Sequence, residues 1–247
     1  MMKILTPVAV AVSIAAGSLL VPMSASADMT GNIGIHSKYL LRGIFEENDG
    51  AAVQGGLDYS HESGLYVGWW FSSLGYSYEA DNDPDITGNG VENDIYGGYA
   101  GELGSVGYDI GLIQYVYVNV DDSNLTEATG TLSLGGGYVG FQTLLNDGWW
   151  GNQGDTYWKA GYAFDLPKDF GLAFDLGWYT YSNDDNSELG SVTKQDSAFR
   201  HFNITLSHPV GKTGADMYAQ YVFAGEDREG NEYDDTMVFG ITYDFDL

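Results

Sequence analysis

The chain has 247 residues, no cysteine, and 35 acidic against 9 basic side chains, for a formal net charge of −26. The lack of cysteine excludes disulfide scaffolds and thiolate metal sites. The acidic balance repels phosphate backbones, so we expect no nucleic-acid partner. With 35 Gly and 19 Tyr but only 5 Pro, the composition favours a β-rich chain with tight turns.

The first 27 residues have the features of a secretory signal peptide. Lys3 gives a short basic start, an apolar stretch follows, and Ala25-Ser26-Ala27 forms an A-x-A cleavage site. The alternative is a membrane anchor, but the apolar stretch contains proline and no basic residues follow it. We therefore predict that residues 1–27 are cleaved and that residues 28–247 form one domain.

Beyond this segment, no apolar run reaches the roughly 18 residues that a membrane helix needs. Apolar and polar residues instead alternate with a period of two, which is typical of β-strands. Twelve stretches show this pattern: 31–43, 51–60, 64–76, 93–102, 106–118, 126–134, 137–145, 155–166, 170–181, 197–208, 215–224 and 234–247. The sixth and seventh are the least clear, so ten and fourteen strands stay open as alternatives.

The connections between these stretches alternate in length. Odd connections, such as residues 77–92 and 182–196, are long and acidic, whereas even ones are short turns of Gly, Ser, Pro and Lys. Barrels of the bacterial outer membrane sort their loops in this way and have an even strand count. We therefore predict an all-β fold, a transmembrane antiparallel up-and-down barrel of twelve strands.

The two faces of the stretches support a membrane barrel. In 170–181, Phe170, Phe174 and Trp178 share one face, and aromatic residues recur near both ends of several stretches, as expected for girdles at the water–lipid boundaries. In 106–118 the apolar parity changes, which suggests a β-bulge near Gln114.

The last stretch alternates up to the end of the chain. Met237, Phe239, Ile241, Tyr243, Phe245 and Leu247 fall on one parity. We expect this strand to pair with the first one and close the barrel, because an open edge in a bilayer would leave backbone groups unpaired.

Residues 31–70 resemble the opening of the TorF-type porin family, also known as the conserved Gcw_chp family of proteobacteria. Three motifs carry the resemblance: Ser37-Lys38-Tyr39-Leu40 with Arg42-Gly43, Gln54-Gly55-Gly56-Leu57-Asp58-Tyr59, and Ser63-Gly64-Leu65-Tyr66. The resemblance extends over nearly all of 29–247. It implies an outer-membrane barrel with a pore function and no defined substrate. Many such barrels end in Phe or Trp, whereas this chain ends in Leu247.

The alternation places charged residues inside the barrel. Lys38, Arg42 and Lys159 share parity with the polar residues of their stretches and are expected in the outer half of the lumen. Arg200 shares parity with apolar residues and is expected to reach toward the lipid headgroups. The acidic residues expected in the lumen are Asp58, Asp165, Asp175, Asp216, Asp244 and Asp246.

These charges allow two interpretations. They could form a constriction that selects small solutes or ions, or an internal ion-pair network that plugs a narrow barrel. A water-filled pore is favoured because twelve strands enclose more space than the eight whose side chains can fill the interior. We take Lys38, Arg42, Lys159, Asp175, Asp58 and Asp216 as the candidate pore-lining residues.

The acidic loop 81–92 has oxygen-bearing residues at several positions of a calcium loop, among them Asp81, Asp83, Asp85 and Glu92. Ile86 stands where that loop requires glycine, and no helices flank it. A solvated acidic loop is therefore the favoured interpretation. Weak bridging of divalent ions to lipopolysaccharide is the alternative.

We expect no enzyme and no cofactor. The four histidines show no G-x-S-x-G or H-E-x-x-H motif, and no phosphate-binding loop is present in the sequence. A barrel hydrolase using His36 or His201 is a remote alternative. The expected partners are outer-membrane lipid, lipopolysaccharide, the barrel-assembly machinery, and small solutes or ions.

Overall fold

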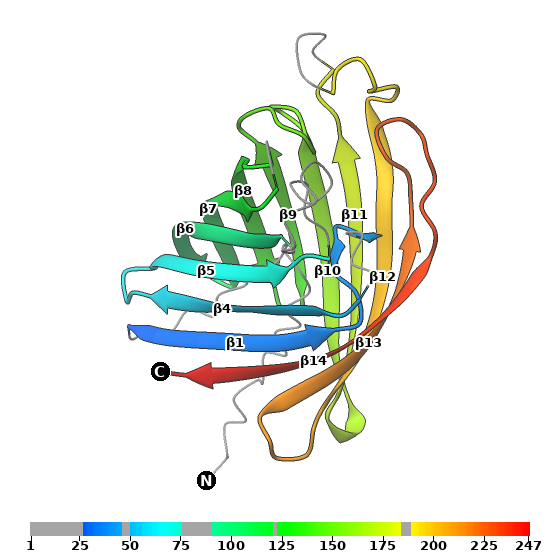
Figure 1. Ribbon diagram of the computed structural model, residues 1–247. Coiled ribbons are helices and arrows are strands. Elements are labelled where there is room, and N and C mark those ends of the chain that lie inside the picture. Colours follow the sequence, from blue (N-terminus) through cyan, green and yellow to red (C-terminus); the bar gives the residue numbers. More distant parts are fainter. Residues whose placement is uncertain (1–26, 46–49, 76–89, 121–122, 184–188) are drawn as a thin grey trace.

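The computed structural model describes residues 27–45, 50–75, 90–120, 123–183 and 189–247. Twelve strands form one closed antiparallel barrel, as predicted (Figure 1). Their bounds are β1 Asp28–His36, β4 Ala52–Ser60, β5 Leu65–Ser73, β6 Val91–Leu103, β7 Val106–Val118, β8 Thr126–Leu134, β9 Gly137–Leu144, β10 Thr156–Leu166, β11 Phe170–Thr180, β12 Ser197–Pro209, β13 Ala215–Ala224 and β14 Thr236–Asp246.

Each strand pairs with its neighbours in sequence, and the first and last strands close the ring. β1 pairs with β14 from Thr30 opposite Asp246 to His36 opposite Gly240, so the predicted closing strand is confirmed. The stretches 126–134 and 137–145 form β8 and β9, which excludes ten strands. The only helix among the described residues is the three-residue turn Pro167–Asp169 between β10 and β11.

No helix in the described ranges is both long and apolar enough to span a membrane.

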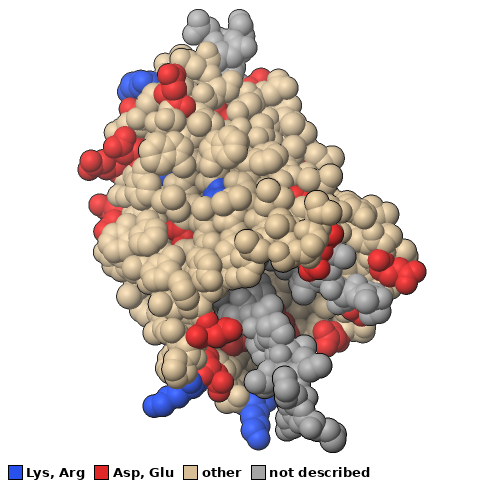
Figure 2. Space-filling model, turned by 180° about the vertical axis from the view of Figure 1, so that it is seen from behind, with Lys and Arg blue, Asp and Glu red and all other residues tan. Residues whose placement is uncertain are grey.

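The outward faces of the strands are apolar. On β14, Met237, Phe239, Ile241 and Tyr243 are all exposed, whereas Val238 on the opposite face is buried. Figure 2 shows the back of the molecule as a mainly uncharged surface, with most acidic and basic side chains toward its ends and edges. An exposed apolar belt of this kind is what a lipid-facing barrel wall requires.

The first predicted strand is shorter than expected. β1 ends at His36, and residues 37–45 fold into a small hairpin made of β2 (Leu40–Leu41) and β3 (Ile44–Phe45). Its turn residues, Arg42 and Gly43, both have positive φ angles of 51° and 80°, as in the tight hairpin turns that favour glycine. The prediction that Lys38 and Arg42 lie in a barrel strand was therefore wrong.

The predicted bulge near Gln114 is also wrong. β7 pairs with β6 and β8 in continuous register, and Ile113, Tyr115 and Tyr117 face the lumen. The parity changes because these apolar side chains pack inside the barrel. A register shift instead occurs in β12, where Gly177 lies opposite His201 and Trp178 opposite Phe199, so that Arg200 is the extra residue.

Tyrosine and glycine recur together on the inner wall. In each of five places a tyrosine ring lies across a glycine of the adjacent strand, and its hydroxyl forms a hydrogen bond of 2.5–3.1 Å with Asp or His one strand further on. We call these tyrosine–glycine bridges. They are Tyr96 over Gly68 to Asp58, Tyr66 over Gly98 to Asp109, Tyr138 over Gly161 to Asp175, Tyr157 over Gly177 to His201, and Tyr218 over Gly240 to His36. A Cβ atom at any of these glycines would collide with the bridge.

Candidate functional site

The β2–β3 hairpin lies inside the barrel and contacts several sides of its wall. Tyr39 is fully buried with Ala52 and Leu74, and its hydroxyl donates to Glu92 Oε2 of β6 at 2.8 Å. Leu40 packs on the opposite side against lumen-facing residues of β13 and β14, among them Val222 and Val238. The hairpin therefore narrows the outer part of the lumen.

Arg42, at the tip of this hairpin, is held by residues from three strands. Its Nη2 lies 2.6 Å from Glu127 Oε2 of β8, and its Nη1 donates to the Tyr179 hydroxyl of β11 at 2.5 Å. The Tyr115 hydroxyl of β7 donates to the same Glu127 oxygen at 2.7 Å. The guanidinium also lies 4.9 Å from the centre of the Tyr157 ring, within range of a cation–π contact. Both members of the ion pair are almost fully buried.

Three carboxylates gather on the wall beside Arg42. Glu92 and Asp94 belong to β6 and Glu127 to β8, and each is at most 4% exposed. Asp94 interacts electrostatically with both glutamates and with Arg42. This part of the lumen thus combines three buried carboxylates with one arginine from the hairpin. The arrangement resembles the internal ion-pair network that the sequence analysis gives as the alternative to a water-filled pore.

Lys159 faces the lumen, as predicted. It is 8% exposed, and its Cε would lie 3.1 Å from a Cβ atom at Gly140 of β9. It interacts electrostatically with Glu127, Asp109 and Asp175. Among the described residues, no carboxylate oxygen lies within 4.0 Å of its ammonium group. Lys159 therefore contributes an internal positive charge that is compensated only over longer distances.

The other candidate residues lie at different heights along the barrel axis. Asp58 and Asp175 face the lumen but are occupied by tyrosine–glycine bridges, with Tyr96 and Tyr138 as donors. Lys38 lies just beyond β1, and its ammonium donates to Thr236 Oγ1 at 2.6 Å. Asp216 lies near the end of β13 that follows a short turn, opposite Thr242. The six residues thus line different parts of the interior, and they do not form one ring.

Below the hairpin, toward the short turns, the inward-facing side chains are mostly small or polar. They include Gly98, Gly111, Gly161, Thr131, Ser133, Ala163, Ala173, Thr205, Ser207 and Thr242. Tyrosine rings lie among them, with Tyr66 across Gly98 and Tyr138 across Gly161. The inner wall toward the short turns is therefore made of small or polar residues and of the tyrosine rings of the bridges.

Arg200 faces the lumen, contrary to the prediction that it reaches the lipid headgroups. The extra residue in β12 turns both Arg200 and His201 inward, and they are 8% and 3% exposed. The Arg200 guanidinium lies 5.4 Å from the Tyr179 ring centre and 5.0 Å from that of Tyr233. Its Nη1 donates to the backbone oxygen of Glu226 at 3.2 Å.

The outer loops are tied to each other above this region. Arg228, in the loop between β13 and β14, forms an ion pair with Asp155 just before β10 and stacks on Tyr181 at 4.9 Å. Burial raises the pKa of the neighbouring Asp227 carboxyl, but hydrogen bonds from Asn231 and the Glu229 amide, with the Arg200 charge, lower it below its ordinary value overall. These contacts fix the 225–235 loop over the lumen.

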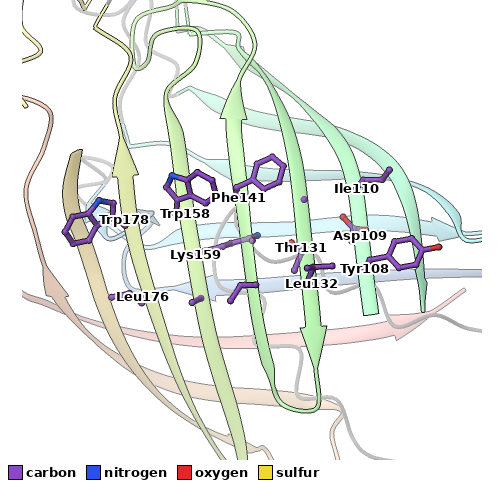
Figure 3. Close-up of a pocket in the computed structure, with 14 residues that line it drawn as sticks. Tyr108, Asp109, Ile110, Thr131, Leu132, Phe141, Trp158, Lys159, Leu176 and Trp178 are labelled. Carbon is purple, nitrogen blue, oxygen red and sulfur yellow. The ribbon is translucent and has the colours of Figure 1, made fainter. Parts of the chain in front are cut away.

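A hollow of about 380 Å³ is lined by residues of β7 to β11. Figure 3 shows Phe141, Trp158 and Trp178 side by side on adjacent strands, while Lys159 points from β10 toward Thr131. The aromatic residues are 37–48% exposed on the outer wall. The lining also includes Lys159 and Asp109, whose side chains are on the lumen side of their strands.

The alternative chemistries gain no support from the described residues. Asp81, Asp83 and Asp85 lie outside the described residues, whereas Glu92 belongs to the inner wall of β6. Within the described ranges no group of three or more His, Asp or Glu side chains is arranged to hold a metal ion. His36 and His201 each form a hydrogen bond with a tyrosine, Tyr218 and Tyr157, in place of a serine.

Several residues of this site were missed. Glu127 and Asp109 have the correct parity for the lumen, so the alternation could have identified them. Tyr179 and Tyr115 also face inward. The alternation of 170–181 already places Tyr179 on the same face as Asp175, whereas Tyr115 follows the change of parity in 106–118. The pairing of Arg228 with Asp155 has no sequence signal, because both lie in or beside loops 73 positions apart.

The comparisons with known proteins agree with this architecture. The model of the family described as "Bacterial protein of unknown function (Gcw_chp)" matches residues 22–245. The chain belongs to this family. No curated protein matches it in sequence.

Among solved structures, the KdgM porin superimposes with a TM-score of 0.55 at 9% identity, covering 87% of this chain and 99% of that one. The COG4313 outer membrane channel from Pseudomonas putida F1 gives 0.52 at 9% identity, covering 90% and 96%. The NanC porin gives 0.51 at 13% identity, covering 87% and 98%. At these identities the likeness concerns the fold, which this Gcw_chp chain shares with outer-membrane porins.

Proposed function

We propose that this protein is a passive channel of the bacterial outer membrane that admits small polar solutes or ions. The observation that carries the proposal is the polar interior of a closed twelve-stranded barrel, with charged side chains inward and apolar side chains outward. A polar interior behind an apolar outer wall is what a water-filled passage through the membrane requires.

The constriction in this proposal lies between the β2–β3 hairpin and the barrel wall. Arg42 and Glu127 fix the hairpin tip, while Lys159, Asp58 and Asp175 line the wall and Asp216 the periplasmic end. Lys38 acts at the rim, where it holds Thr236. Solutes would pass by diffusion, with no catalytic step and no cofactor.

The comparisons support the proposal without giving its substrate. The structures with the same fold include KdgM, one of them described in complex with disordered oligogalacturonate. The sequence resemblance to the TorF-type porins points in the same direction. For this chain the solute class must come from its own lumen.

The proposal includes the route to the membrane. Residues 1–27 serve as a cleaved signal peptide, the barrel-assembly machinery inserts residues 28–247, and lipid with lipopolysaccharide surrounds the apolar belt. The acidic outer loops are solvated in this proposal, and weak bridging of divalent ions to lipopolysaccharide belongs to the alternative of a closed barrel.

A second function is favoured by one observation. The hairpin contacts β6, β8, β11, β13 and β14, and Arg228 joins two outer loops. A barrel closed in this way could serve a structural or adhesive role through its outer loops.

Liposome swelling separates the two functions. Proteoliposomes containing the refolded barrel are diluted into isotonic solutions of graded polar solutes, such as glycine, arabinose and sucrose. We expect swelling that slows as solute size increases. Swelling rates equal to those of liposomes with heat-denatured protein, for every solute, would favour the closed barrel.

A further inference from the structure

Arg200 differs from the other two arginines of the chain. Arg42 is paired with Glu127, and Arg228 with Asp155. Within the described residues, no carboxylate oxygen lies within 4.0 Å of the Arg200 guanidinium. In a chain with 35 acidic against 9 basic side chains, an arginine without an acidic partner is unexpected.

The backbone of β12 is arranged so that Arg200 enters the lumen. With regular pairing its side chain would share the lipid-facing side with Phe202 and Ile204. The one-residue shift between Gly177 and Trp178 places it inside, next to His201. Bulges often redirect a side chain beside a functional site, and here the redirected side chain is the unpaired arginine.

The surroundings hold the guanidinium in place, and the Asp227 carboxylate interacts with its charge only beyond ion-pair distance. The Tyr179 and Tyr233 rings flank it, and one of its nitrogens, Nη1, donates to the Glu226 backbone. Among the residues that the structure describes, the buried Nε group has no hydrogen-bond partner. Arg200 is 8% exposed. Burying a guanidinium N–H group costs free energy unless an acceptor forms a hydrogen bond with it.

The nearest acidic loop does not provide that acceptor. The Glu226 carboxylate accepts a hydrogen bond from Gln195 Nε2 at 3.2 Å. Asp227 accepts hydrogen bonds from Asn231 and from the Glu229 amide. Both carboxylates are engaged within the loops, and neither accepts a hydrogen bond from the Arg200 Nε group.

We propose that Arg200 is an anion-binding residue of the lumen and that the channel favours small carboxylate solutes. A planar carboxylate can accept two parallel hydrogen bonds from one edge of a guanidinium. Lys159, on the same wall and also without a close acidic partner, adds a second positive charge deeper in the lumen. This inference rests on the proposed channel function and gives it a solute class.

Succinate serves as the probe in the experiment. Potassium succinate is titrated against the chloride current through the barrel in planar bilayers, and calorimetry measures its binding to the detergent-solubilised barrel without any need for conductance. We expect succinate to lower the current and to bind. Arg200→Gln should raise the half-blocking concentration by about tenfold or more, because a charge-assisted bidentate contact is lost.

Two further variants complete the design. Arg200→Lys keeps the charge but loses the planar fork, so it should fall between wild type and Arg200→Gln. Lys212→Gln removes the same charge from an exposed periplasmic turn, and it should match wild type. Heat-modifiable gel mobility checks folding, and the wild-type calorimetry still tests the site if Arg200→Gln does not fold.

The outcomes separate this inference from the proposed function. A wild-type barrel that conducts but neither binds succinate nor is blocked by it would overturn the carboxylate site and leave the channel standing. Equal block of Arg200→Gln and wild type would overturn the role of Arg200. A barrel that binds succinate through Arg200 without conducting would overturn the channel and keep the site.

Discussion

At the scale of single residues, tyrosine–glycine bridges account for much of the composition. Each bridge needs a ring on one strand, a glycine on the next to accommodate it, and an Asp or His beyond. The ring covers the exposed backbone of the glycine strand, and the hydrogen bond fixes the position of the acid or imidazole. The many glycines and tyrosines are therefore part of the inner wall as well as of turns.

Gly68→Val tests one of these bridges. The valine side chain would occupy the place of the Tyr96 ring and separate its hydroxyl from Asp58. We expect a loss of roughly 2 kcal/mol in the free energy of unfolding, measured by urea titration in detergent. Gly50→Val, where no described residue lies within 4 Å of the new Cβ, is the control. Equal stability of the two variants would refute the bridge as a stabilising unit.

The ion pair at the hairpin tip gives a second prediction. Arg42→Ala leaves Glu127 buried without its cation, which should lower the free energy of unfolding by about 3 kcal/mol. Lys194→Ala breaks an exposed pair with Glu229 and should change it by less than about 1 kcal/mol. Urea titration of both variants makes the comparison. A smaller loss for Arg42→Ala than for Lys194→Ala would contradict the buried contact.

At the scale of elements, the closing strand β14 explains why alternation continues to the end of the chain. Phe245 lies over Gly31 of β1, and Leu247 donates its amide to the Met29 carbonyl at 2.9 Å. The terminus is thus paired along its length, and no backbone edge is left open in the bilayer.

The double variant Phe245→Ser with Leu247→Ser should prevent assembly, because it removes the lipid-facing end of the closing strand. Asp244→Ser with Asp246→Ser changes the same number of residues on the inward face and should assemble. Membrane fractionation and heat-modifiable mobility report the result. Normal assembly of the first variant would show that these two side chains are not required.

Elements also show where sequence reasoning succeeds. Alternation located all twelve barrel strands, and several within one residue, because burial on one face imposes a strict period of two. It failed where the chain departs from that period. The hairpin at Arg42 and Gly43 was merged into the first strand, and the bulge at Arg200 reversed the predicted face of that side chain. The residues that contact Arg42 come from strands far away in the sequence, so no local pattern could predict them.

At the scale of the whole molecule, charge is distributed across the barrel. Glu92, Asp94 and Glu127 lie on β6 and β8, while Lys159 and Arg200 lie on β10 and β12. Three buried acids therefore lie on the side of the lumen near Arg42, and two basic residues lie on the other side, with Asp175 of β11 between them. This arrangement explains how a chain with a net charge of −26 can still present a site for anions.

Single-channel recording in planar bilayers tests the central claim most directly. The purified, monodisperse barrel should produce discrete conductance steps, and Arg42→Ala, which releases the hairpin tip from Glu127, should produce larger ones. Heat-denatured protein provides the baseline. A folded wild-type barrel that gives no steps above that baseline would contradict the account of this protein as a channel.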